Sequence, residues 1–116
     1  MKLALRSIHS ADVDHLDLWT PSNDFGVAVR LTVGPQGGPG EESFDLTVCT
    51  GGWLAAQARE HGCIEGTHHL VVDHYDWSVI STYIASRVDR CEGATWREAA
   101  EQLAKFAHWE FEDYKH

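Results

Sequence analysis

Hydrophobic and polar residues alternate along two neighbouring stretches of the chain. In residues 25–33 the odd positions are Phe, Val, Val, Leu and Val, with small or polar residues and Arg30 between them. In the second stretch Phe44, Leu46 and Val48 alternate with Ser, Asp and Thr. An apolar residue at every second position is typical of a strand with one buried face. Both stretches are therefore predicted to be strands.

The segment between them, residues 34–40, holds four of the ten glycines and two of the three prolines. Such a density of helix- and strand-breaking residues predicts an irregular hairpin loop. Antiparallel pairing of the two strands would set one apolar face beside the other. It would also bring Arg30 close to Asp45 or to Thr47, depending on the register.

Two shorter strands are predicted from the remaining apolar runs. Residues 2–8 carry Leu3 and Leu5 on one face, and residues 69–73 contain a Leu-Val-Val run that predicts a strand buried on both faces. The segment between the first two strands, residues 9–24, is acidic and rich in turn-forming residues. Trp19 is expected to pack this segment against the rest of the molecule.

Helix-capping residues mark two helices in the middle of the chain. Thr50 is a candidate N-cap for a short helix that continues to about Glu60 and would bury Leu54 and Ala58. Asp76 is a candidate N-cap for a longer helix. Apolar residues at helical spacing give this second helix its predicted core stripe, which comprises Trp77, Ile80, Tyr83, Ile84 and Val88.

A third helix is predicted near the end of the chain. Thr95 and Glu98 have the spacing of a capping box, in which a hydroxyl and a carboxylate each accept a hydrogen bond from an unpaired backbone N–H. The predicted core stripe of this helix comprises Trp96, Ala99, Ala100, Leu103, Phe106 and Ala107.

The order of these elements predicts an α+β fold. We expect a mostly antiparallel four-stranded sheet packed by about three helices on one face. The helix that follows the third strand could serve as a parallel crossover to the fourth. The length of 116 residues suits a single domain spanning residues 1–116.

The chain is strongly acidic, with 18 Asp and Glu against 9 Lys and Arg and a net charge of −9 at pH 7. A surface of one sign attracts partners of the opposite sign, so a basic protein partner is expected. Nucleic-acid binding is disfavoured because there is no basic stripe to neutralise phosphates. No stretch is long enough to span a membrane, and the three cysteines lack metal or redox spacing, which favours a reducing, cytoplasmic setting.

Acidic and aromatic residues occur together after the glycine-rich loop and in the segment 109–114. Aromatic side chains can anchor a protein contact, and carboxylates can meet its basic groups. The same residues could equally pack against the core or support the fold through ion pairs. As a hypothesis, the candidate partner-binding residues are Glu41, Glu42, Asp45, Glu110, Glu112 and Asp113.

Three enzyme-like arrangements are weaker alternatives. Cys49 ends a strand just before a predicted helix N-terminus, a position that lowers the pKa of a thiol. His68 and His69 are adjacent, but they point to opposite sides of a strand and lack the spacing of a zinc site. Glu110 and Glu112 would share a face of an extended segment, as paired catalytic carboxylates could. We therefore expect no metal and no cofactor.

Three blocks of the sequence resemble the immunity protein 8 family of bacterial polymorphic toxin systems. They are residues 40–50 followed by Trp-Leu at 53–54, residues 68–72 followed by Tyr-Asp at 75–76, and Thr-Trp at 95–96 followed by residues 109–114. Residues 2–14 fit at the front, so the resemblance covers nearly the whole chain.

The resemblance implies a small cytoplasmic antidote that binds and neutralises a cognate toxin domain, without catalysis and without a cofactor. An antidote to a nuclease-like toxin would cover a basic cleft, which suits the charge of this chain. The alternative is a small cytoplasmic enzyme that uses Cys49 or a site centred on His68 and His69. The oligomeric state stays open.

Overall fold

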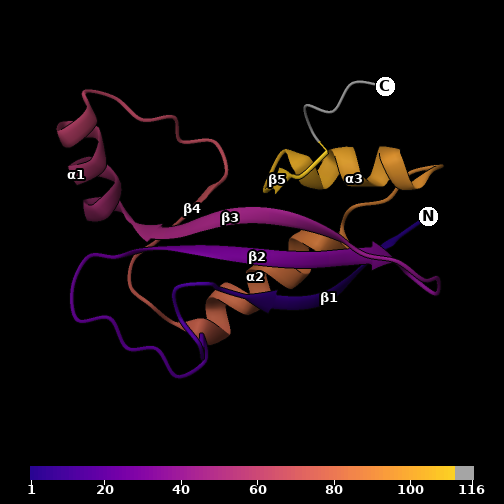
Figure 1. The fold of residues 1–116 in the computed structure, drawn as a ribbon, viewed down its shortest axis with the longest axis horizontal. Helices are drawn as coiled ribbons and strands as arrows, with labels where there is room; N and C mark the ends of the chain where they lie inside the picture. The colour runs from indigo at the N-terminus through magenta and orange to yellow at the C-terminus, as the bar shows by residue number, and fades with distance from the viewer. Residues whose placement is uncertain (112–116) are drawn as a thin grey trace.

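The computed structural model describes residues 1–111, which form five strands and three helices. In chain order these are β1 (Leu3–His9), β2 (Gly26–Pro35), β3 (Glu42–Thr50), α1 (Gly51–His61), β4 (His69–Val72), α2 (Trp77–Asp89), α3 (Trp96–Ala104) and β5 (His108–Trp109). The predicted α+β class with a mostly antiparallel sheet is confirmed (Figure 1). The two-residue strand β5 is an addition that the sequence pattern did not predict.

The sheet has the order β1-β2-β3-β4, with β5 also beside β3. β2 runs antiparallel to both β1 and β3, whereas β4 pairs parallel to β3 after the predicted crossover through α1. β4 and β5 occupy the same edge of β3, at its two ends. In the β2–β3 hairpin Arg30 is paired with Asp45, which decides between the two predicted registers.

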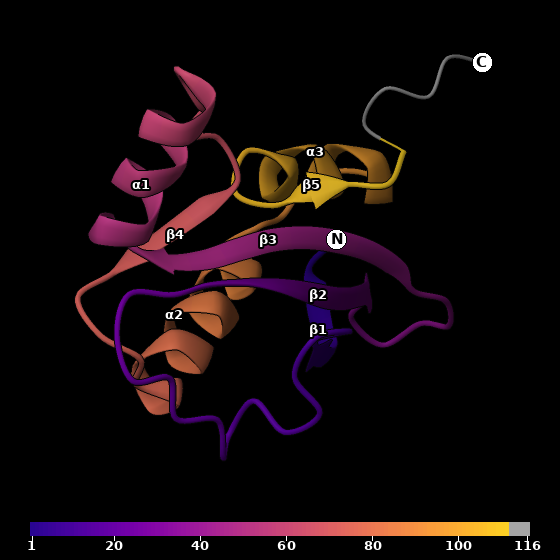
Figure 2. The same ribbon diagram turned by 60° about the vertical axis from the view of Figure 1, so that its left-hand side comes forward.

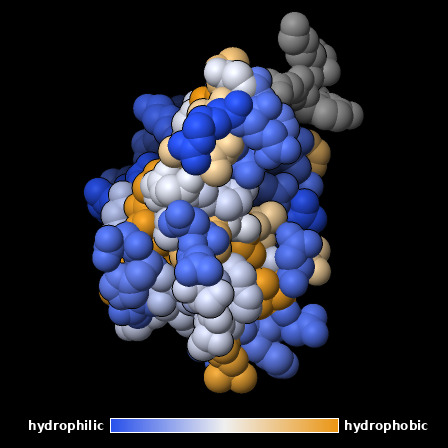
Figure 3. Space-filling view, turned by 90° about the vertical axis from the view of Figure 1, so that its left-hand side faces the viewer, coloured by the Kyte–Doolittle hydropathy of each residue, from blue (hydrophilic) through white to orange (hydrophobic). Residues whose placement is uncertain are grey.

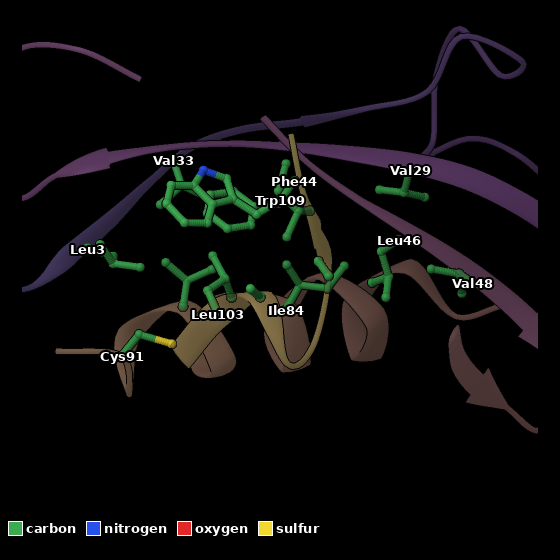
Figure 4. Close-up of a cluster of buried hydrophobic side chains, with 14 of the residues drawn as sticks. Leu3, Val29, Val33, Phe44, Leu46, Val48, Ile84, Cys91, Leu103 and Trp109 are labelled. Carbon is green, nitrogen blue, oxygen red and sulfur yellow. The ribbon is translucent and has the colours of Figure 1, made fainter. Parts of the chain in front are cut away.

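The core lies between one face of the sheet and the helices α2 and α3. Val29 and Leu46 are cross-strand partners on that face, and both are buried. Figure 4 shows side chains of β2 and β3 directed towards Ile84 of α2 and Leu103 of α3. Tyr83, predicted to belong to the core stripe of α2, is instead 45% exposed. It lies on the flank of the helix next to β4, where the sheet ends.

Helix α1 is attached to the sheet differently. It contains no buried residue, so the prediction that it buries Leu54 and Ala58 was wrong. The helix stands at the end of β3 that is remote from the hairpin loop (Figures 1 and 2). Its contact is made by Trp53, whose ring lies so close to Gly26 that a Cβ atom there would be 2.2 Å from the ring. Alternation along β2 puts Gly26 on the face opposite to Val27 and the core.

Strand β4 is an edge strand, and the prediction that it is buried on both faces was wrong. Val71 is 51% exposed, and His69, Leu70 and Val72 are only partly buried. The apolar run does form a strand, as predicted. Because β4 is the last strand in the sheet order, other elements cover it only in part.

The predicted caps are in place. The side chains of Thr50, Asp76 and Thr95 each accept a hydrogen bond from the backbone N–H three residues later, at 3.4, 3.3 and 3.2 Å. Glu98 departs from the predicted capping box. Its carboxylate accepts a hydrogen bond at 2.8 Å from Ala94 N, one residue before the N-cap Thr95, and not from the N-cap itself. α3 ends at Ala104, so Phe106 follows the helix instead of continuing its stripe.

The segment between β1 and β2 is held by aromatic contacts. The ring of Trp19 meets the rings of Phe25 and Tyr75 edge-on, with centroid distances of 5.4 and 4.8 Å respectively. Trp19 therefore packs this segment against the rest of the molecule, as predicted. The Tyr75 hydroxyl donates to the Leu16 carbonyl at 2.6 Å. Among the helices of residues 1–111, none has the length and apolar character needed to cross a bilayer.

Candidate functional site

Four of the six candidate contact residues gather where β5 pairs with β3. Glu42 and Asp45 belong to β3, Glu41 precedes it, and Glu110 follows β5 directly. The pairing of Asp45 with His108 brings Glu110 back to the start of β3. The remaining candidates, Glu112 and Asp113, lie outside the described residues.

Asp45 forms a two-pronged ion pair with Arg30 across the β2–β3 ladder. The distances are 2.8 Å from Arg30 Nε to Asp45 Oδ1 and 3.1 Å from Nη2 to Oδ2. The hydrogen bond to Asp45 and then its charge raise the pKa of Arg30, and the charge of Glu110 acts in the same direction. Both side chains are about half exposed, so the pair contributes little to stability but fixes the direction of the carboxylate.

Two further carboxylates are oriented by hydrogen bonds. Glu110 Oε1 accepts from Ser43 N at 2.9 Å, while Glu110 N donates to Ser43 O at 3.2 Å. Glu42 Oε1 accepts from the indole N–H of Trp109 at 3.2 Å. Neutral donors leave the negative charge of each carboxylate in place while they restrict its position. Glu41 is exposed at the start of the strand.

Residues on the open face of the sheet extend this cluster into a cross-strand row. Arg30 pairs with His9 on one side and Asp45 on the other, and Asp45 pairs with His108. All four have exposed or half-buried side chains. Sequence reasoning missed the two histidines, because their places in the row depend on the registers of β1 and β5, which alternation alone does not set.

The aromatic residues beside the cluster serve the core more than the surface. Phe44 is fully buried and stacks on Trp109, itself buried, with ring centroids 6.1 Å apart. Phe44 is therefore too deeply buried to anchor a surface contact. Phe111 is 38% exposed and meets Trp109 edge-on, with ring centroids 6.1 Å apart. Tyr114 is outside the described residues.

The environment of Cys49 is the opposite of the one expected for a nucleophile. Its side chain is fully buried in β3, and burial raises the pKa of the thiol. The expected lowering at a helix N-terminus was wrong because desolvation of the thiolate dominates here. All three cysteines are free thiols.

The adjacent histidines have separate structural roles. His68 has a left-handed backbone, with φ of 62°, and its Nε2–H donates to the Ala104 carbonyl at 2.7 Å. His69 Nδ1–H donates to the Thr67 carbonyl at 2.9 Å. Each ring thus uses one nitrogen to hold the connection that leads into β4. Within residues 1–111 no group of three or more His, Cys, Asp or Glu has a metal-binding arrangement.

The geometry of this region is that of a fixed, charged surface. Hydrogen bonds orient three of its carboxylates, those of Glu42, Asp45 and Glu110. The guanidinium of Arg30 binds Asp45, and that of Arg97 lies over the ring of Trp109, 5.9 Å from its centroid. Such a surface can bind a complementary protein, and its chemistry is recognition by charge and hydrogen bonding.

Comparison with known proteins identifies the family. The model of the family described as Immunity protein 8 matches residues 3–114. Neither a curated protein nor a solved structure matches the chain. The family match covers nearly every residue, including all the elements of the fold and the β3–β5 cluster. The chain therefore belongs to the immunity protein 8 family, whose members are immunity proteins against toxins.

Proposed function

We propose that this chain neutralises a basic, nuclease-like bacterial toxin domain by binding over it, without catalysis, in the cytoplasm of the cell that makes both. It acts as a single domain and needs no cofactor. The observation that carries the proposal is the set of oriented carboxylates at the β3–β5 pairing. We define this acidic surface as Glu41, Glu42, Asp45 and Glu110 and extend it, as a proposal from sequence, to Glu112 and Asp113.

Charge at the acidic surface supports a basic partner. The four described carboxylates carry four negative charges, and Arg30, which pairs with Asp45, offsets one of them, which leaves three net negative charges at pH 7 with histidine neutral. The rest of the chain, at −9 overall, adds to the same field. Opposite charge accelerates association, which an antidote needs because a free toxin acts within its own cell.

Fixed geometry supports binding as well as attraction. Asp45 is held by Arg30, Glu110 by Ser43 and Glu42 by Trp109. Side chains that are already ordered lose little conformational entropy when a partner docks. The carboxylates can therefore occupy the positions that substrate phosphates would take in the toxin, at a modest entropic cost.

Neutral isosteres test the acidic surface. A triple variant, Glu41→Gln, Glu42→Gln and Glu110→Gln, keeps the accepting oxygens but removes three charges. We expect its association rate with the cognate toxin domain to fall about tenfold at low salt, with a shallower salt dependence. Stopped-flow fluorescence at several salt concentrations measures both quantities.

A matched control separates this surface from overall charge. The variant Asp12→Asn, Asp14→Asn and Glu60→Gln also removes three exposed charges, from the β1–β2 segment and from α1. It should slow association much less. Equal slowing by the two triple variants would show that the acidic surface has no special place in the contact.

The absence of catalysis is tested by growth protection. Cells that co-express the toxin should survive equally well with the wild-type chain and with Cys49→Ala, and an equimolar complex should be recovered. Loss of protection by a folded Cys49→Ala variant that still binds the toxin would contradict a purely binding role.

A further inference from the structure

The free edge of β4 is open to pairing. Within residues 1–111, β4 pairs only with β3. Thr47 N donates to the His68 carbonyl at 3.0 Å, which sets the phase of the parallel ladder. In such a ladder alternate residues point their backbone groups to the neighbour, so those of Leu70 and Val72 face β3. The N–H and C=O groups of His69 and Val71 then face away from the sheet.

An apolar groove lies along this edge, between β4 and α2. It has a volume of about 390 Å³ and is lined by Leu70, Val71 and Val72 together with Val79 and Tyr83 of α2. Three of these side chains are large, apolar and strongly exposed: Val71 at 51%, Val79 at 60% and Tyr83 at 45%. Seen from the α1 end of the molecule, hydrophobic and hydrophilic side chains are interspersed over the surface (Figure 3).

The two edges of the sheet differ in how they are protected. β1, at the opposite edge, carries the charged Arg6 and has a register irregularity between Leu5 and Ser7. Charges and bulges are the devices by which proteins prevent unwanted pairing of an edge strand. The Leu70–Val72 run of β4 has no charged residue, proline or bulge, so this edge is suited to pairing with a partner strand.

Charges beside the groove select the partner. Asp73 directly follows β4 with a fully exposed side chain, and Asp76 lines the same groove. The groove lining contains no Lys or Arg, and its histidine, His74, is bound to Asp73 at 3.1 Å. A second copy of this chain would bring the same aspartates together and add its own net charge of −9. A cationic partner removes that repulsion.

We propose that β4 binds an extended segment of the toxin as an added β-strand. The segment places an apolar side chain in the groove beside Val79 and a Lys or Arg against Asp73 and Asp76. Main-chain hydrogen bonds to His69 and Val71 supply affinity, and the groove and the carboxylates supply specificity. The inference rests on the proposed function. β4 and β5 lie on the same side of β3, so one partner can reach this edge and the acidic surface together.

Proline substitution at an outward-facing position tests the added strand. Val71→Pro removes the N–H that would pair with the toxin while leaving the inward-facing groups of Leu70 and Val72 in place. The probe is a catalytically inactive form of the cognate toxin domain. We expect Val71→Pro to weaken binding by about tenfold or more, whereas Val71→Thr, which keeps the N–H, weakens it far less. Isothermal titration calorimetry gives the affinities, and circular dichroism verifies folding.

Hydrogen exchange on the wild-type complex provides an independent readout that needs no variant. The amides of His69 and Val71 should exchange more slowly by at least about tenfold once the toxin is bound. Unchanged exchange at both amides, or wild-type affinity of a folded Val71→Pro, would overturn the proposal. A dimer of the free chain that Val71→Pro converts to a monomer would also overturn it, by showing that a second copy occupies the edge.

Failure here is distinguishable from failure of the proposed function. If the complex forms while exchange at the amides of His69 and Val71 is unchanged, toxin binding stands and the β4 edge is excluded. If no complex forms with the toxin domain, both proposals fall.

Discussion

Individual residues in this molecule carry more than one task, and Thr50 is the clearest case. It is the sole polar residue among the buried side chains of residues 1–111. Its hydroxyl oxygen accepts from Trp53 N at the start of α1 and from Phe25 N at the start of β2, at 3.4 and 3.2 Å. One oxygen therefore caps a helix and also accepts from the buried N–H of Phe25, the residue before β2.

Removing that oxygen should lower the free energy of unfolding more than the loss of an ordinary helix cap does. We expect Thr50→Ala to lower the free energy of unfolding by about 2 kcal/mol, because α1 loses its cap and the Phe25 N–H loses an acceptor. Urea unfolding measures the change. Thr50→Ser, which retains the oxygen, should stay within about 1 kcal/mol of the wild type. Equal destabilisation by the two substitutions would assign the loss to the methyl group.

The elements differ in how firmly they are attached. β2, β3 and α2 share the core, whereas α1 contributes no buried residue and is held mainly by its cap and by Trp53. Trp53 fits because position 26 is glycine: a Cβ atom there would overlap the indole ring. Sequence alone gives Gly26 no special role, since it is one small residue in an alternating strand.

The attachment of α1 predicts an interaction between two substitutions. Gly26→Ala should displace Trp53 and destabilise the protein by about 2 kcal/mol. In a Trp53→Ala background the clash is absent, so the same substitution should cost much less. A double-mutant cycle from urea unfolding measures this coupling. Additive effects would indicate that Gly26 is needed for the strand and not for the ring above it.

At the scale of the whole molecule, burial couples stability to alkaline pH. Desolvation raises the pKa of the Cys49 and Cys91 thiols, and desolvation followed by the charge of Asp17 raises the pKa of Tyr75. The unfolded chain releases these protons near the ordinary values of 9.0 for a thiol and 10.0 for tyrosine. Folding keeps the groups protonated, so the stability they contribute is present below pH 9 and is lost as the pH rises through the raised values.

The free energy of unfolding should therefore fall steadily above about pH 9. Cys91→Ala or Tyr75→Phe should make this decline shallower, because each removes one group that ionises more readily in the unfolded chain. Urea unfolding between pH 7 and pH 11 measures the slope, with Cys63→Ala, which removes an exposed thiol, as the control. A slope that neither Cys91→Ala nor Tyr75→Phe changes would contradict the assignment.

Local patterns determined much of this protein from sequence alone. Alternation located β2 and β3, capping residues located the starts of α1, α2 and α3, and the order of elements gave the α+β class. These features depend on neighbours within a few residues, which a sequence displays directly. The excess of acidic residues is likewise visible in the sequence, and the basic partner that it favours is a proposal.

Tertiary structure alone decided where distant segments meet. It paired Arg30 with Asp45, placed Trp109 and Glu110 against β3 from 67 residues away, and left the apolar run of β4 at an edge. It also buried Phe44 and Cys49, which removed them from the surface. The physical reason is that alternation fixes which side a residue faces, while strand order and register, which are set by packing between remote segments, decide what it faces.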